Sequence, residues 1–100
     1  MTKYNKKDLL SKAISKIGLY TQAESAILNK MIEVSIDNIA VIQAKDLKKQ
    51  IELSHTAIYS SLKTLQLKGI ITKLQSQPHS YALNQEKLEY AINLYKSLKN

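Results

Sequence analysis

Ala44 to Ile71 reads AKDLKKQIELSHTAIYSSLKTLQLKGII, and its apolar spacing predicts two helices that meet at a tight turn. Leu47 and Ile51 lie four residues apart on one face of the first helix, and Leu53 in the turn is placed to close over them. The lysines of this helix fall on the opposite face. We therefore expect one face of the first helix to pack and the other to be basic.

The second helix is expected to begin after Ser54, whose hydroxyl can cap the free backbone N–H groups of the first turn. Ile58, Leu62 and Leu65 follow at four- and three-residue intervals and predict a buried stripe. Gly69 accepts the left-handed backbone that ends many helices. The pair predicts a helix-turn-helix, in which the second helix commonly enters the major groove of DNA.

Short strands are predicted on both sides of the helix pair. Ile70 to Leu74 is partly β-branched, residues 75–79 form a polar run that contains the only proline, and Ser80 to Leu83 can return as a second strand. Ile39 to Ile42 predicts a third strand before the helix pair. The sequence thus predicts a mainly α fold with a small β-hairpin, which is an α+β class.

This order of elements resembles the winged helix-turn-helix of bacterial transcription regulators, in groups such as the MarR-like and ArsR-like repressors. The resemblance covers residues 39–83, and no subfamily is assigned. The matching apolar, cap and glycine positions are Leu47, Ser54, Ile58, Leu62, Leu65, Gly69, Ile70 and Ile71. The resemblance implies that the hairpin is the wing and that the second helix contacts base edges in DNA.

Helices are also expected outside the motif. We expect residues 1–100 to form a single winged-helix domain, with N-terminal helices in 1–37, the core in 39–83 and a C-terminal helix in 84–100. Thr21 and Glu24 have the spacing of a capping box. Asn5 and Asn84 are the expected caps of the first and last helices.

The first and last helices carry a surplus of apolar side chains, for which two explanations stay open. They could pack against each other within the chain, or they could form a two-fold homodimer. We expect the dimer, because small regulators of this kind pair two recognition helices on half-sites one DNA turn apart. The residues expected at the dimer interface are Leu10, Ile14, Leu88, Ile92 and Tyr95.

Composition excludes several classes of function. The chain of 100 residues is 44% hydrophobic and lacks both a membrane-length apolar run and a signal peptide, so we expect a cytoplasmic protein without membrane contact. It has no cysteine and only two histidines, so no metal site and no cofactor are expected. Scattered acidic residues and the lack of a glycine-rich phosphate loop predict no catalytic residues, and hence no enzyme.

The net charge of +7 favours a polyanionic partner, since lysines that neutralise phosphates release counterions. Charge alone is not decisive, because many small lysine-rich proteins are basic for compositional reasons. All 15 basic residues are lysines, so the chain lacks the usual guanine reader and the usual minor-groove probe, which are both arginine.

The expected base readers face away from the buried stripe of the second helix: His55, Thr56, Tyr59, Ser60 and Lys63. Contacts to the DNA backbone are expected from Lys45, Lys48, Lys49, Ser54 and Lys73, together with Lys3, Lys6 and Lys7 of the N-terminal arm. The wing residues expected to bind sugar or phosphate oxygens are Gln75, Ser76, Gln77 and His79. An ordinary solvated surface is the competing explanation for each of these groups.

The predicted function is sequence-specific binding of double-stranded DNA by a small homodimeric transcriptional regulator of a bacterium, phage or plasmid. Repression by occlusion is the simplest mechanism, because no effector domain is expected. Two alternatives remain open: a winged helix that serves as a protein–protein interaction module, and an accessory DNA-binding protein in plasmid or phage replication, partition or excision.

Overall fold

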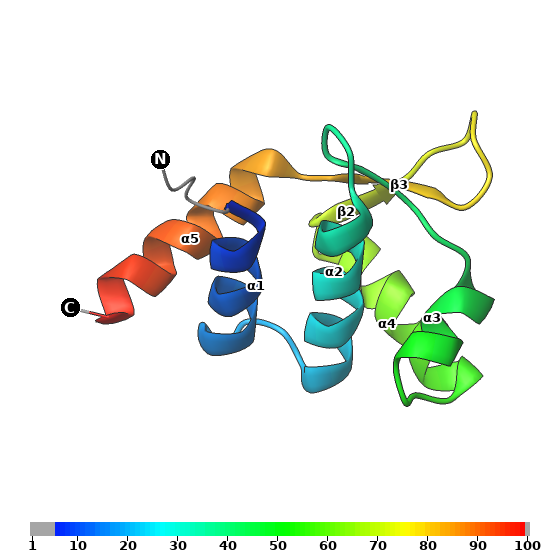
Figure 1. The fold of residues 1–100 in the computed structure, drawn as a ribbon, viewed down its shortest axis with the longest axis horizontal. Coiled ribbons are helices and arrows are strands. Elements are labelled where there is room, and N and C mark those ends of the chain that lie inside the picture. The colour runs from blue at the N-terminus through cyan, green and yellow to red at the C-terminus, as the bar shows by residue number, and fades with distance from the viewer. Residues whose placement is uncertain (1–5, 100) are drawn as a thin grey trace.

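The computed structural model describes residues 6–99, which form a mainly helical chain with a small antiparallel sheet (Figure 1). The predicted α+β class is confirmed at this level. The elements in chain order are α1 (Lys6–Lys16), α2 (Gln22–Val34), β1 (Ile39–Val41), α3 (Ala44–Gln50), α4 (His55–Leu67), β2 (Ile71–Lys73), β3 (Ser80–Leu83) and α5 (Gln85–Lys99). Within residues 6–99, no helix has the length and apolar composition that a bilayer crossing requires.

The strands form one antiparallel sheet in the order β1-β3-β2, so the last strand of the sequence lies at its centre. Ala40 of β1 pairs with Tyr81 of β3, and Thr72 of β2 pairs with Ala82 of β3. Alternate residues point to opposite faces. Ala40 and Tyr81 are therefore buried under the helices, whereas Val41 and Thr72 are exposed on the outer face.

Local hydrogen bonds set the helix ends as the sequence predicts. Thr21 Oγ1 accepts from the backbone N–H of Glu24 at 3.0 Å, and the Glu24 carboxylate accepts from the N–H of Thr21 at 2.9 Å, which completes the capping box. Asn84 Oδ1 accepts from the N–H of Lys87 at 3.1 Å in the first turn of α5. Asn5, the expected cap of the first helix, lies outside the described residues.

Left-handed backbone occurs at two turns that frame the helix pair. Gly69 has a φ of +79° just after α4, as predicted. Asp37 and Asn38, with φ values of 53° and 66°, reverse the chain between α2 and β1. Ile36 and Ile39 close this turn by exchanging backbone hydrogen bonds of 2.9 and 3.0 Å. These turns set the direction of the chain after α4 and its direction on entering β1.

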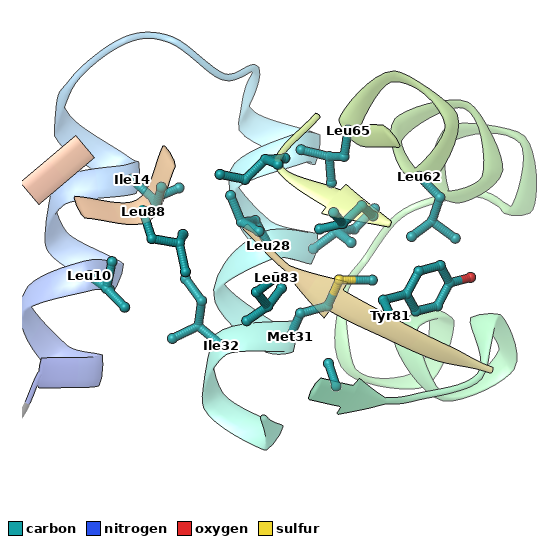
Figure 2. Packing of buried hydrophobic residues seen from close by; sticks show 14 of the residues in the cluster. Leu10, Ile14, Leu28, Met31, Ile32, Leu62, Leu65, Tyr81, Leu83 and Leu88 are labelled. Carbon is teal, nitrogen blue, oxygen red and sulfur yellow. The ribbon is translucent and has the colours of Figure 1, made fainter. Parts of the chain in front are cut away.

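The core is centred on α2, which packs against α1 on one side and α4 on the other, while α5 packs against α1. Leu28 and Met31 of α2 are fully buried at the junction between these parts (Figure 2). Leu47 of α3 is also fully buried. Ile51 and Leu53 of the following turn are partly buried against the same cluster, so the predicted packing of the turn is confirmed.

Candidate nucleic-acid interface

The candidate interface includes the turn between α3 and α4. Ser54 has an extended backbone, with φ −72° and ψ 162°, and its Oγ accepts from the N–H of Ala57 at 3.1 Å. The predicted N-cap is therefore confirmed. Because the cap satisfies a backbone group that would otherwise lack a partner, it defines where α4 starts and which side chains its first turn presents.

The side chains of α4 divide into a buried face and an exposed face. Ile58, Leu62 and Leu65 are buried against the core. The five expected readers are all exposed: His55, Thr56, Tyr59, Ser60 and Lys63. Helical geometry gathers these five on one side of α4. The structure therefore brings together the whole predicted reader set on one surface, which we call the reader face.

Aromatic rings form part of the reader face. His55 and Tyr59 stack, with ring centroids 6.1 Å apart and planes 14° from parallel. Tyr59 is 57% exposed, so its ring adds little to the core. Tyr81 of β3 is only 8% exposed and is one of the buried residues of the core (Figure 2), but it lies close enough to Tyr59 for the two side chains to interact electrostatically. Burial, and then the nearby Tyr59, raise the pKa of Tyr81, so its hydroxyl stays protonated at neutral pH and can donate a hydrogen bond.

The α3 helix adds positive charge beside the motif. Lys45, Lys48 and Lys49 are exposed, whereas Leu47 is completely buried. This is the predicted division into a basic face and a packed face. Asp46 in the first turn of α3 is half-buried and reduces the positive charge of this helix locally. The three lysine side chains remain available to a polyanion.

The distribution of acidic residues distinguishes this part of the chain. No Asp or Glu occurs between Glu52 and Glu86, a segment that includes α4, β2, the wing loop and β3. The same segment carries Lys63, Lys68 and Lys73. A polyanion that approaches α4 and the hairpin therefore meets no carboxylate of this segment. Any carboxylate near that surface belongs to a neighbouring element.

The wing loop connects β2 to β3 and is exposed at every predicted contact position: Gln75, Ser76, Gln77 and His79. Lys73 is exposed at the end of β2. The buried hydroxyl of Ser80 donates to Gln77 Oε1 at 3.3 Å, so this amide is partly engaged in holding the loop. The wing thus offers amide, hydroxyl and imidazole groups with a single lysine.

No family model, curated protein or solved structure matches this chain. The interpretation of the reader face therefore depends on the geometry and chemistry of its own residues. Within residues 6–99, no three His, Asp or Glu side chains lie close enough to hold a metal ion.

Most of the residues expected at a dimer interface are instead buried within the chain. Leu10, Ile14, Leu88 and Ile92 are at most 7% exposed, because α1 and α5 pack against each other within the chain. These four side chains are therefore not available to a second copy, and their assignment to a dimer interface is wrong. Tyr95 is half-buried against the same cluster. Dimerisation itself stays a prediction.

The N-terminal lysines are only partly described. Lys7 Nζ donates to the backbone carbonyl oxygens of Glu33 at 3.1 Å and Ser35 at 2.8 Å, at the end of α2. It therefore stabilises the end of that helix, where backbone carbonyls lack partners within the helix. Lys3 and the side chain of Lys6 lie outside the described residues.

A polar cluster that the sequence interpretation missed joins α2 to α4. Glu24 accepts from Lys68 Nζ at 2.7 Å and from the Thr64 hydroxyl at 2.5 Å, in addition to its hydrogen bond with Thr21. Glu24 is only 4% exposed. Lys68 Nζ also lies 5.1 Å from the centre of the Tyr20 ring. We call Glu24, Thr64 and Lys68 the α2–α4 clamp.

The clamp holds a charged carboxylate in the interior. Burial acts to raise the pKa of Glu24, but hydrogen bonds from Lys68, Thr64 and the N–H of Thr21, together with the charge of Lys68, outweigh it and leave the pKa below its ordinary value. The one available sequence signal was the four-residue spacing of Thr64 and Lys68, which places them on the same side of α4. That spacing does not identify a partner 44 residues away.

Proposed function

We propose that this protein is a winged helix-turn-helix protein that binds double-stranded DNA through α4. The order of α2, β1, α3, α4, β2 and β3, with β3 central in the sheet, supports the winged-helix interpretation. In this interpretation α3 contacts the DNA backbone, α4 enters the major groove, and the β2–β3 loop is the wing.

The reader face is the observation that carries the proposal. An exposed helix face with a tyrosine, a histidine, two hydroxyl side chains and a lysine has donors, acceptors and an aromatic surface for base edges and thymine methyl groups. Tyr59 is particularly informative, because an aromatic ring that is 57% exposed gains little stability from packing. Contact with a ligand explains its position better than the fold does.

The positive charge near the reader face supplies the nonspecific part of the affinity. Lys45, Lys48 and Lys49 of α3 and Lys63 of α4 are exposed, and Lys73 extends this set to the hairpin. Because the wing lacks arginine, we assign it to phosphate and sugar contacts rather than to insertion into the minor groove.

Homodimerisation stays part of the proposal, with a different surface from the one first expected. Tyr90 and Leu98 on α5 are 60% and 61% exposed, and Leu94 lies between them at four-residue spacing. A two-fold pair would present two α4 helices to a palindromic site. Repression by occlusion of a promoter is the simplest role for such a dimer, in the cytoplasm of a bacterial cell.

A protein-interaction module is the second candidate, and the outer face of the sheet favours it. Ile36 is 76% exposed and Val41 is 62% exposed, and they lie near each other because Ile36 bridges to Ile39 in the same strand as Val41. Exposed apolar side chains that gather on one surface are common at protein interfaces. Accessory roles in plasmid or phage replication, partition or excision would use the same DNA-binding surface.

Fluorescence anisotropy with a random-sequence duplex, titrated from low to moderate salt, tests the proposal. DNA binding through lysines predicts that the logarithm of the association constant falls linearly with the logarithm of salt, by about 0.9 for each phosphate neutralised. A short peptide rich in Asp and Glu is the polyanion control. Failure to bind duplex at low salt would exclude DNA binding and favour the protein-interaction module.

A further inference from the structure

Two kinds of contact hold α4 against the rest of the protein. Ile58, Leu62 and Leu65 bury an apolar stripe against the core. Burial of apolar surface is not directional, so this stripe resists separation from α2 more strongly than it resists rotation of the helix about its own axis. The α2–α4 clamp is directional, because a carboxylate accepts short hydrogen bonds only from donors in defined positions.

The two clamp residues of α4 also lie beside the reader face. Helical geometry places Thr64 and Lys68 at the border between the buried stripe and the reader face, on the side of Ser60. Glu24, in turn, is fixed by its own capping box at the start of α2. A rotation of α4 would move the two donors away from a carboxylate that cannot follow them.

A second directional contact supports the same end of α4. Asn84 donates from its side chain to the carbonyl oxygen of Gly69 at 3.1 Å and from its backbone to the carbonyl oxygen of Ile70 at 2.8 Å. The chain just after α4 is thus held by the residue that precedes α5, while the clamp holds the end of α4 from α2. The end of α4 is fixed from both sides.

We propose that Glu24, Thr64 and Lys68 are positioning residues that set the rotation of α4, and through it the discrimination between DNA sequences. The inference rests on the proposed DNA-binding function. Base-edge contacts need their side chains held within roughly 10–20° of the productive direction. Contacts between lysines and phosphates tolerate larger errors, since they depend mainly on charge and distance. Release of the clamp should therefore weaken specific binding more than nonspecific binding.

The test compares two duplexes of equal length. One is selected from a random library by the wild-type protein, and the other is a scramble of the same base composition. Thr64→Val removes the hydroxyl donor with almost no change in shape, and Lys68→Met removes the ammonium. Lys96→Met, in the exposed part of α5, is the control because it removes the same charge far along the sequence from the clamp.

We expect Thr64→Val and Lys68→Met each to lower the affinity for the selected duplex by about tenfold, since hydrogen bonds to a buried charge are among the stronger ones. The affinity for the scramble should change less than twofold, as it should for Lys96→Met on both duplexes. Lys68→Arg, which keeps the charge and can still donate to Glu24, should recover most of the discrimination. Circular dichroism at the binding temperature shows that each variant is folded.

An unchanged ratio of the two affinities in both folded clamp variants would overturn the inference while leaving DNA binding intact. An equal loss on both duplexes would also overturn it, because it would indicate a purely structural role. If the wild-type protein binds neither duplex at low salt, the proposed function fails instead. If Lys68→Met does not fold, Thr64→Val and Lys68→Arg decide the question.

Discussion

Lys68 Nζ lies 2.7 Å from Oε1 of Glu24, and this contact joins the end of α4 to the first turn of α2. The carboxylate side of this ion pair is buried, since the Glu24 side chain is 5% exposed, whereas the Lys68 side chain is 41% exposed. The pair therefore couples the ionisation of one carboxyl group to the stability of the fold.

The pH dependence of unfolding should carry the signature of Glu24. Its pKa is lowered in the folded protein, so the folded state binds the proton less readily than the unfolded state. The stabilisation is complete above the ordinary pKa of a glutamate and is lost as pH falls through the lowered folded-state pKa. Urea unfolding at a series of acidic pH values should show this loss, and Glu24→Gln should make the acid limb shallower.

Glu24→Gln should also lower the free energy of unfolding at neutral pH by about 1–3 kcal/mol, the range for hydrogen bonds to charged groups. Glu33→Gln is the matched control, because Glu33 is an exposed carboxylate of the same helix that pairs with Lys30. Equal unfolding curves for the two variants at neutral pH would contradict the stabilising role of the clamp.

Ser54 allows stability and DNA binding to be separated. Ser54→Ala should lower the free energy of unfolding by about 1 kcal/mol, because it removes the cap of α4. Ser54→Asp should keep the cap and the stability but place a negative charge at the start of α4, and so weaken duplex binding in anisotropy experiments. If Ser54→Asp binds DNA as tightly as wild type, Ser54 does not lie near the phosphates.

Substitutions of Gly69 and Gly18 by alanine should have similar costs. Both residues have a left-handed backbone, with φ of +79° and +78°, so an added side chain costs about 1–2 kcal/mol at either position. At Gly69 the new Cβ would lie 3.2 Å from Cε of Lys87, the flexible part of a side chain that can move, whereas at Gly18 it would meet nothing within 4 Å. A much larger loss in thermal unfolding for Gly69→Ala would mean that Lys87 is held in place.

Tyr59 and Lys63 test the reader face directly. Tyr59→Ala should lower the affinity for a selected duplex by about tenfold while leaving thermal unfolding nearly unchanged, because the ring is mostly exposed. Lys63→Ala should reduce the slope of log affinity against log salt by about 0.9. Lys96→Ala on α5 should leave the slope at its wild-type value. Wild-type affinity in both α4 variants would exclude this face as the DNA contact.

Sedimentation equilibrium tests the revised dimer surface. Tyr90→Ser and Leu98→Ser together should shift a dimer toward monomer, because they remove the two most exposed apolar side chains of α5. Ile36→Ser with Val41→Ser, on the outer face of the sheet, is the control and should leave the association constant unchanged. A wild-type monomer at every concentration would exclude dimerisation through either surface.

Local features of this fold could be predicted from the sequence because they depend on neighbouring residues. The Thr21–Glu24 box, the Ser54 cap and the left-handed Gly69 each follow from a hydrogen bond or a steric limit within a few positions. The exposed side of α4 was also predicted correctly, because helical periodicity alone separates Tyr59 from Ile58.

The same local reasoning does not predict which helices pack against each other. An apolar stripe shows that a helix must be covered but not by what, so Leu10 and Leu88 were assigned to a partner although α1 and α5 cover each other. The contact of Glu24 with Lys68 was missed for the same reason. Its two residues come from helices that are brought together only by the packing of the core between them.

The position of α5 has a practical consequence for spectroscopy. Its last turns lie at one end of the long axis and α3 lies toward the other (Figure 1), and the chain contains no cysteine. Ser97→Cys, at an exposed site near the end of α5, would thus create a unique thiol for a fluorophore or a spin label. Such a probe would report the tumbling of a DNA complex while the label itself stayed clear of the reader face.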